Sequence, residues 1–493
     1  MAVWFDVTDL SIWENPQLTG IQRTIVNVLA ELLTLRDDVR LFRYNLRSGD
    51  LEEVHGSTLP SAICQRVFGD EFEHLRKVQK KVQTPVRLGP VQTLPSTEPA
   101  ARPIRQTVGL LIRRFGNEEI LYALKDCWRD ARRLSTAVRH KIRKPQPHND
   151  VEEPLPPPLN ADLLDKPLRP LFQENDVCLS LAATWTFTGY AETIARHRAA
   201  TPFKHIIMIY DLIPTLFPQW VAPGFSRIIT LWVRQQIANA DLVLTISQFQ
   251  KKEIETYIRK SALPLTPVRA IRLGDDPKLM PDSVPPLPRV VPNRPFVLCV
   301  STLDVRKNQI CLYQIWRRMA EEMGEGCPEL VLVGLWHQHV ADLLYQIRHD
   351  PLVNRLITHL RDVHDAELAW YYRNCLLTVY PSVYEGWGLP VGESLAHGKY
   401  CIASNAASLP EVGGSLVDYF DPLDFMECYR KVRRAIADPA YVRQKEELIR
   451  RTYQPVPWRA TATQINAHVD ALLADASPSN STGSPEKEKA AVA

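Results

Sequence analysis

Short apolar runs alternate with amphipathic helical patterns along both halves of this 493-residue chain. The runs at 3–7, 205–210, 241–246, 296–302 and 376–380 have the length and apolar content of buried strands. Strands that are separated by helices pair as parallel sheets. The chain is also longer than one hydrophobic core usually supports. We therefore predict an α/β protein with two domains, each built around a parallel sheet.

A proline-rich stretch from Ser283 to Pro288 marks the predicted boundary between the domains. Residues 1–285 are expected to form the N-terminal domain and residues 286–475 the C-terminal domain. A helical run that begins at Trp458 is expected to pack back across both. Residues 476–493 contain too little apolar surface to fold, so we predict a disordered tail.

Residues 45–175 depart from this pattern through many prolines and two basic helical runs. Between Arg102 and Lys144, twelve Lys or Arg stand against four Asp or Glu, whereas the net charge of the whole chain is only +3. Such a segment could lie on an anionic membrane face, or it could be a solvated insert packed on its own domain. The sequence leaves both open. Nucleic acid is not expected as a partner, because no aromatic stacking platform or finger motif accompanies the charge.

A glycine-rich turn at Glu385–Leu389 lies between a predicted strand and a helix that Pro390 is expected to open. Ligands of open α/β sheets bind at this edge, and the free N–H groups of a helix start attract a diphosphate. Glu385 and Glu393 can each accept hydrogen bonds from the vicinal diols of a ribose or a hexose. The arrangement predicts a binding site for a nucleotide-linked sugar, against the alternative of a plain surface helix.

The whole string around this pair resembles the signature of retaining glycosyltransferase family 4, the glycosyl transferases group 1. The resemblance implies the glycosyltransferase B architecture, in which two Rossmann-like domains with parallel sheets face a central cleft. It places Glu385 near the transferred sugar and Glu393 on the ribose. Arg306 and Lys307 match an Arg-Lys pair that holds the donor diphosphate in the family. Fixed cations at that point stabilise the departing nucleoside diphosphate more in the transition state than in the ground state.

The N-terminal half extends the resemblance through Gly20–Arg23 and Tyr210–Pro214. Gly20 resembles the glycine that lets the first loop approach the donor phosphates or the acceptor. Many relatives have His-Asp where this chain has Tyr210 and Asp211, and a tyrosine cannot act as a base near neutral pH. Asp211 is therefore the candidate for contacting an acceptor hydroxyl.

The predicted site divides into residues that act in catalysis and residues that bind the donor. The catalytic set is Glu385, Arg306, Lys307 and Asp211. The donor-binding set is Gly20, Arg306, Lys307, Gly386, Trp387, Gly388, Leu389, Glu393, Ser408 and Leu409. No hydrophobic strand ends in an Asp-x-Asp metal motif, so we expect neither a metal ion nor a cofactor besides the nucleotide-sugar substrate.

By this resemblance the chain is a retaining hexosyltransferase of bacterial surface polysaccharide synthesis, close to lipopolysaccharide and exopolysaccharide mannosyl or rhamnosyl transferases. GDP-mannose is the first choice of donor, with UDP- and dTDP-linked sugars open. The acceptor is expected to be a glycan or a lipid-linked oligosaccharide. Front-side attack is implied, with the departing phosphate oxygen taking the proton of the acceptor. Two alternatives remain, a glycoside hydrolase with two carboxylates and a non-catalytic nucleotide-sugar-binding protein.

The start of the chain lacks a basic region, an apolar core and a cleavage site, so secretion is not expected. No apolar run reaches the roughly 20 residues of a membrane span. The nine cysteines are scattered and include no CxxC pair, which indicates reduced core residues. We expect a cytoplasmic protein, with peripheral contact at the inner membrane face as an option. Sugar, linkage, processivity and oligomeric state are not fixed by the sequence.

Overall fold

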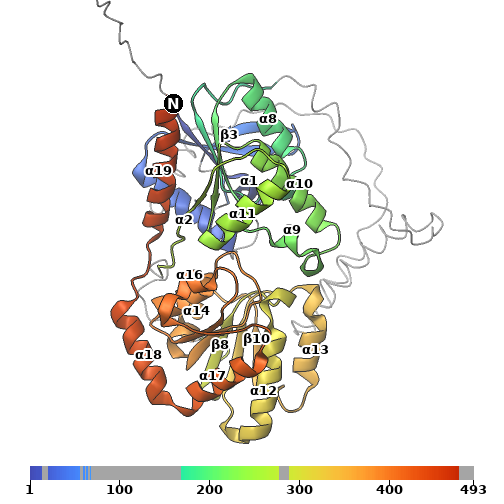
Figure 1. Cartoon of the computed structure of the whole chain (residues 1–493), viewed down its shortest axis with the longest axis vertical. Coiled ribbons are helices and arrows are strands. Elements are labelled where there is room, and N and C mark those ends of the chain that lie inside the picture. The colour runs from blue at the N-terminus through green and yellow to red at the C-terminus, as the bar shows by residue number, and fades with distance from the viewer. Residues whose placement is uncertain are drawn as a thin grey trace, which may run out of the picture. The chain divides into compact units, whose positions relative to one another are not determined.

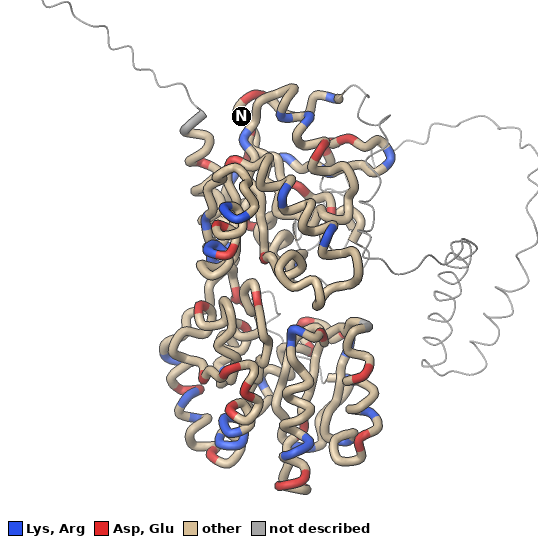
Figure 2. The backbone as a smooth tube through the Cα atoms, turned by 45° about the vertical axis from the view of Figure 1, so that its right-hand side comes forward, with Lys and Arg blue, Asp and Glu red and all other residues tan. Residues whose placement is uncertain are grey.

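The computed structural model describes residues 1–13, 20–55, 59–60, 63–64, 67, 168–276 and 288–476. Most of the basic insert, most of the proline-rich boundary and the tail lie outside these residues, so the predictions about them stay predictions. Along the described backbone, Lys and Arg positions are interspersed with Asp and Glu (Figure 2). Within the described ranges, no helix has both the length and the apolar character needed to cross a bilayer.

The first sheet has seven strands in the order β3-β2-β1-β4-β5-β6-β7 (Figure 1). Every neighbouring pair is parallel except β2 and β3, which are antiparallel. We call the part built on this sheet the N-terminal lobe. Its strands are β1 Val3–Asp6, β2 Val39–Asn45, β3 Asp50–Val54, β4 Val177–Ser180, β5 Lys204–Met208, β6 Leu242–Thr245 and β7 Val268–Ala270.

The helices of this lobe follow the strands along the chain. Ile25, Val28, Leu29 and Leu32 of α2 are buried at the spacing of one helix face, as the sequence predicted. Ser247 caps α11 by accepting the backbone N–H of Gln250 at 3.0 Å. The helices are α1 Thr8–Ser11, α2 Gly20–Leu35, α8 Tyr190–Ala200, α9 Ile213–Leu216, α10 Phe225–Ala238 and α11 Gln248–Lys260.

The second sheet has six strands, all parallel, in the order β10-β9-β8-β11-β12-β13. We call the part built on it the C-terminal lobe. Its strands are β8 Phe296–Val300, β9 Glu329–Val333, β10 Ile357–Leu360, β11 Leu377–Tyr380, β12 Cys401–Ser404 and β13 Asp418–Phe420. The prediction of an α/β protein with two largely parallel sheets is confirmed.

Helices connect the strands of the second sheet, as parallel pairing requires. They are α12 Gln309–Met323, α13 Ala341–His349, α14 Asp365–Asn374, α15 Leu389–Ala396, α16 Leu409–Gly413, α17 Phe425–Ala437 and α18 Pro439–Thr452. A 3-10 turn, η5 Val305–Lys307, lies between β8 and α12.

The last helix, α19 Trp458–Ala476, returns to the N-terminal lobe and packs on α2. Arg459 donates to the hydroxyl of Thr34 at 2.8 Å, and Arg36 donates to the side chain of Asn466 at 2.9 Å. A Cβ atom on Gly274 would lie 2.8 Å from the Trp458 ring, so only glycine fits beneath this helix start. The expected return of the C-terminal helix is confirmed.

Each sheet has one point where the order of its strands along the chain reverses. In the first sheet this point lies between β1 and β4, and in the second between β8 and β11. Ligands of such sheets bind outside the carboxyl ends of the strands at these switch points. The loops that follow these four strands are therefore where a site is expected.

Candidate active site

The turn after β8 is held against the turn after β11. The Asp304 carboxylate accepts the backbone N–H of Arg306 at 3.1 Å and so fixes the start of η5. Asn308 takes a left-handed conformation, with φ of 58°, and its side-chain amide donates to the carbonyls of Pro381 at 3.1 Å and Pro422 at 3.0 Å. The two loops at the switch point thus form one unit, which places Arg306 beside the turn that carries Glu385.

Glu385 receives both cations that the sequence predicted for the site. Arg306 Nη1 lies 2.9 Å from Oε2, and Lys307 Nζ lies 2.5 Å from Oε1. The Tyr380 hydroxyl donates to the same Oε1 at 3.0 Å and accepts from Lys307 Nζ at 2.7 Å. Glu385 is 5% exposed and Lys307 is 9% exposed. The structure therefore brings the predicted catalytic Glu385, Arg306 and Lys307 together and adds Tyr380.

Burial and charge act in opposition within this cluster. Burial alone would raise the pKa of Glu385, but the charges of Lys307 and Arg306 outweigh it and bring that pKa to about 2. Burial and the like charge of Arg306 lower the pKa of Lys307 to about 8. Near neutral pH the cluster holds two cations and one carboxylate. An anionic ligand is favoured at a site with this surplus of positive charge.

The glycine-rich turn after β11 depends on two close approaches. Gly388 has φ of +112°, and a Cβ atom there would lie 2.4 Å from the Leu409 side chain. A Cβ atom on Gly386 would lie 3.1 Å from the carbonyl oxygen of Tyr210 and 3.2 Å from Cβ of Asp211. The positive φ favours glycine at position 388, the space at Gly386 is tight for a Cβ atom, and the predicted Asp211 lies directly against the turn.

Contacts of Ser408 and of the Trp387 side chain stabilise this turn. The Ser408 hydroxyl donates to the carbonyls of Glu385 at 3.0 Å and Trp387 at 2.8 Å. The Arg272 guanidinium lies over the Trp387 ring at 4.4 Å and donates to Asp275 at 2.6 Å. These contacts show how both side chains shape the turn. Their predicted contact with the donor stays a prediction.

Glu393, in the second turn of α15, is held by partners from both lobes. Its Oε1 accepts from Arg23 Nη1 at 2.6 Å, and its Oε2 accepts from the Tyr372 hydroxyl at 2.9 Å. Arg23 also lies 3.6 Å from the Asp365 carboxylate. Arg23 belongs to α2 of the N-terminal lobe, so this ion pair joins the lobes. No pattern in the sequence indicated this ion pair, because residues 23 and 393 are 370 positions apart.

Gly20, at the start of α2, lies beside the start of α15. A Cβ atom on Gly20 would lie 3.7 Å from the side chain of Leu389, an ordinary contact distance. The helix α15 begins at Leu389, one residue before the proline that was expected to open it. Gly20 and Leu389, both predicted to bind the donor, are thus neighbours, although the space at Gly20 does not demand glycine.

Asp211 accepts the backbone N–H of Ile213 at 3.0 Å through Oδ1. Burial raises the pKa of Asp211, and the nearby charge of Arg306 opposes that rise. The adjacent Tyr210 donates its hydroxyl to the carbonyl of Leu181 at 3.0 Å. The structure therefore places Asp211 within the electrostatic reach of the Arg306 and Glu385 cluster.

Glu411 has a structural partner in the other lobe. Its carboxylate accepts the backbone N–H groups of Gln248 at 2.7 Å and Phe249 at 2.6 Å, which are the first residues of α11. Acidic groups are favoured at a helix N-terminus. Glu411 therefore caps α11.

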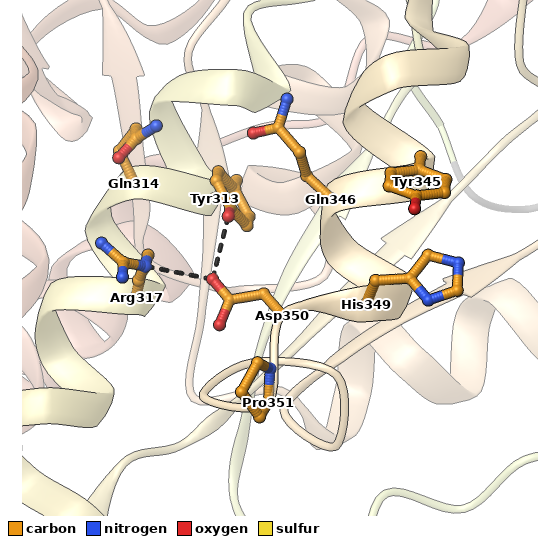
Figure 3. Close-up of a pocket in the computed structure, with 8 residues that line it drawn as sticks. All are labelled: Tyr313, Gln314, Arg317, Tyr345, Gln346, His349, Asp350 and Pro351. Atoms are coloured by element: carbon orange, nitrogen blue, oxygen red, sulfur yellow. Dashed lines mark hydrogen bonds and ion pairs between the residues drawn. The ribbon is translucent and has the colours of Figure 1, made fainter.

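A separate pocket of about 340 Å³ lies between α12 and α13 (Figure 3). Inside it the Asp350 carboxylate accepts from the Tyr313 hydroxyl at 2.9 Å and from Arg317 Nε at 3.1 Å. None of the predicted site residues lines this pocket. Its lining residues are Tyr313, Gln314, Arg317, Tyr345, Gln346, His349, Asp350 and Pro351.

The described residues contain no group of three or more His, Cys, Asp or Glu placed to hold a metal ion. The expectation of a metal-independent site remains a prediction. The eight described cysteines are all buried, as expected of core residues, and none of them forms a disulfide with another described cysteine.

The cations and glutamates described above gather at the switch point of the second sheet. Residues 294–435 match the family described as Glycosyl transferases group 1. This region contains Arg306, Lys307, Glu385 and Glu393. The chain therefore carries a glycosyl transferases group 1 domain, as its motifs indicated.

Curated relatives of the chain include bacterial mannosyltransferases. Over 251 residues it is 28% identical to O-antigen chain mannosyltransferase B of Escherichia coli, which covers 50% of this chain and 62% of that protein. Over 246 residues it is 26% identical to the serotype-specific mannosyltransferase WbdA of Escherichia coli, covering 47% of this chain and 29% of that protein. The chain thus matches less than two thirds of the length of these relatives.

Solved structures similar to the chain include two sugar-phosphate synthases. Sucrose-phosphate synthase from Thermosynechococcus elongatus has a TM-score of 0.46 and 22% identity over 61% of this chain and 74% of that chain. An α,α-trehalose-phosphate synthase from Burkholderia vietnamiensis has a TM-score of 0.47 and 14% identity over 63% of this chain and 73% of that chain. The fold assignment rests on the strand order and pairing of this chain itself.

Proposed function

We propose that the chain is a hexosyltransferase that moves a sugar from a nucleotide sugar to a sugar hydroxyl during synthesis of a bacterial surface polysaccharide. The buried group of Arg306, Lys307 and Glu385 at the switch point between β8 and β11 carries this proposal. The group lies in the domain that matches glycosyl transferases group 1. GDP-mannose is the first choice of donor, because the curated relatives are mannosyltransferases. UDP- and dTDP-linked sugars are the alternatives.

The cations would act on the leaving group. Negative charge grows on the nucleoside diphosphate as the glycosidic bond breaks, and fixed cations stabilise that state. Removing one such partner typically costs about 3 kcal/mol of barrier, or roughly a hundredfold in rate. The donor diphosphate would take the place at Arg306 and Lys307 that Glu385 occupies in the empty site. Glu385 would then be released toward the hydroxyls of the transferred sugar.

The retaining course with front-side attack is part of the same proposal. In that course the departing phosphate oxygen takes the acceptor's proton, so no enzymatic base is needed. Tyr210, which replaces the family's histidine, supports this view, since burial raises its pKa and its hydroxyl is used by the carbonyl of Leu181. Asp211 is the proposed contact for an acceptor hydroxyl.

A glycoside hydrolase fits the site less well. Such an enzyme needs one carboxyl group that stays protonated to act as the general acid. The two cations hold the pKa of Glu385 at about 2, so this group stays ionised. Release of reducing sugar from a glycan without any nucleotide would nevertheless favour the hydrolase and overturn the proposal.

The test is transfer by the purified chain. The protein is incubated with GDP-mannose, UDP-glucose or dTDP-rhamnose and an alkyl α-mannoside, and products are separated by mass. Transfer from one of these donors supports the proposal, and Lys307→Ala should reduce it about a hundredfold. Lys431→Ala is the control, because Lys431 pairs with Glu427 on the outside of α17. Donor binding without any consumption would identify a non-catalytic nucleotide-sugar-binding protein instead.

We place the reaction in the cytoplasm, with peripheral contact at the inner membrane face. The support is the basic segment between Arg102 and Lys144, which lies outside the described residues. Sedimentation with anionic vesicles tests this part. Binding that disappears on deletion of residues 102–144 would support it, and binding that persists would not.

A further inference from the structure

Two buried aspartates, Asp6 at the end of β1 and Asp9 in α1, differ in how fully they are hydrogen-bonded. Both oxygens of Asp6 are engaged. Oδ1 accepts the backbone N–H of Thr8 at 2.9 Å and its hydroxyl at 2.5 Å, and Oδ2 accepts the Tyr190 hydroxyl at 2.5 Å. Asp6 is thus a structural group that ties the end of β1 to α8.

Asp9 uses only one of its oxygens. Oδ2 accepts from the Gln22 side chain at 3.1 Å and from the backbone N–H of Ala183 at 3.3 Å. Oδ1 is equally enclosed, yet it has no hydrogen-bond partner within the part of the chain that the structure describes. Native proteins rarely leave a buried acceptor unpaired, because its desolvation is then uncompensated. An unpaired buried oxygen of this kind is a candidate for accepting a hydrogen bond from a ligand.

The position of Asp9 indicates which ligand. Asp9 follows β1 and Ala183 follows β4, so their hydrogen bond spans the switch point of the first sheet. The next strand, β5, leads to Tyr210, whose pKa is raised by the charge of Asp9 after the larger effect of burial. The carbonyl of Tyr210 faces Gly386 of the donor turn. Asp9 therefore lies on the edge of the N-terminal lobe that meets the donor turn.

A hydroxyl group is a suitable occupant for this place, because it can donate and accept at the same time. Four residues after Asp9, the indole Nε1 of Trp13 is also buried, and no described group accepts its hydrogen bond. One segment thus offers an unpaired acceptor and an unpaired donor. The hydroxyls of a sugar present both functions.

We infer that Asp9 binds the acceptor, with Oδ1 accepting a hydrogen bond from a hydroxyl of the acceptor sugar. This inference rests on the proposed transfer to a sugar hydroxyl and names the N-terminal residue that selects the sugar. It assigns Asp9 to acceptor recognition and Asp6, three residues earlier, to the structure of the lobe. The contrast between the two aspartates supplies the test.

The experiment compares Asp9→Asn with Asp6→Asn. Affinity for methyl α-D-mannopyranoside and a panel of α-linked mannobiosides is measured by calorimetry with GDP present, and the acceptor KM is measured with the same glycosides. Asp9→Asn should weaken affinity and raise the acceptor KM at least tenfold, with GDP affinity unchanged. Its melting temperature should not fall, because the amide keeps an accepting oxygen in place of Oδ2 and no described partner is lost at Oδ1, whereas both oxygens of Asp6 have partners to lose. Asp6→Asn should lower the melting temperature and leave glycoside affinity unchanged.

Three results would overturn the inference: equal glycoside affinity in Asp9→Asn and the natural protein, a loss of folding in Asp9→Asn as large as in Asp6→Asn, or no glycoside binding by the natural protein. Failure of the proposed function is seen separately. In that case no nucleotide sugar is consumed under any condition, while glycoside binding still responds to Asp9.

Discussion

Replacing Glu385 with glutamine tests the electrostatic account of the site most directly. The substitution keeps the shape of the side chain and removes its charge. Arg306 and Lys307 then remain buried without their anion, which is strongly destabilising in protein interiors. We expect a stability loss that depends on pH in a specific way.

The magnitude follows from the pKa of Glu385. The fall from 4.5 to about 2, at about 1.4 kcal/mol per pKa unit, corresponds to about 3 kcal/mol of stability at neutral pH. Because the folded-state pKa is lowered, this stability is fully present above pH 4.5 and is lost as pH falls toward 2. About 1 kcal/mol should remain at pH 3.

The pKa shift of Lys307 has the opposite effect on stability to that of Glu385. Its pKa falls from 10.5 to about 8 on folding, so its charge costs about 3 kcal/mol below pH 8. That cost is relieved as pH rises from about 8 to 10.5. The burial of Lys307 thus opposes the stabilisation that Glu385 contributes at neutral pH.

Denaturant unfolding of the natural protein and Glu385→Gln at pH 7, 5 and 3 measures the effect. The difference should be about 3 kcal/mol at pH 7 and should shrink by pH 3. Glu321→Gln is the control, because its exposed carboxylate pairs with Arg317 on α12 at 3.9 Å and surface pairs contribute little. Equal stability at pH 7, or a difference that does not change with pH, would refute the reasoning.

Three further substitutions probe the rest of the site. Lys307→Ala should lower the rate of sugar transfer about a hundredfold in single-turnover assays while donor affinity changes less; equal rates would contradict its role. Glu393→Ala should weaken donor affinity in calorimetry, and unchanged affinity would remove it from the donor site. Gly388→Ala should cost roughly 1 to 3 kcal/mol in denaturant unfolding, because its φ is +112° and Leu409 blocks a Cβ atom. Gly326→Ala is its control, with nothing within 4 Å, and should change stability little.

The sequence predicted those parts of the structure that are encoded locally. Short apolar runs identified five of the thirteen described strands, β1, β5, β6, β8 and β11, with their ends placed to within one or two residues. Arg306, Lys307 and Glu385 could be expected together, because each follows a predicted strand and parallel strands bring their carboxyl ends to one edge.

The parts that the sequence did not predict depend on distant contacts. The partners of Glu411 are 162 and 163 positions away, and the contact between Asp9 and Ala183 spans 174. No pattern of spacing reports such pairs. Tyr380 was read only as the end of a strand, and its role as a third partner of Glu385 depends on the side-chain direction at that end. Local patterns thus located the site. Tertiary contacts determine which of its side chains already have hydrogen-bond or ion-pair partners.

Glu385 and Glu393 are each paired with cations, and these ion pairs bear on the proposed donor site. Glu385 is paired with Arg306 and Lys307, and Glu393 with Arg23. In the proposed function, the donor diphosphate competes with Glu385 for the first two cations, and the ribose competes with Arg23 for Glu393. Because Arg23 belongs to the N-terminal lobe, the second exchange breaks an ion pair between the lobes. We expect Arg23→Leu to tighten nucleotide binding and Arg23→Lys to leave it near the natural value. Unchanged affinity in Arg23→Leu would show that the ribose does not compete for Glu393.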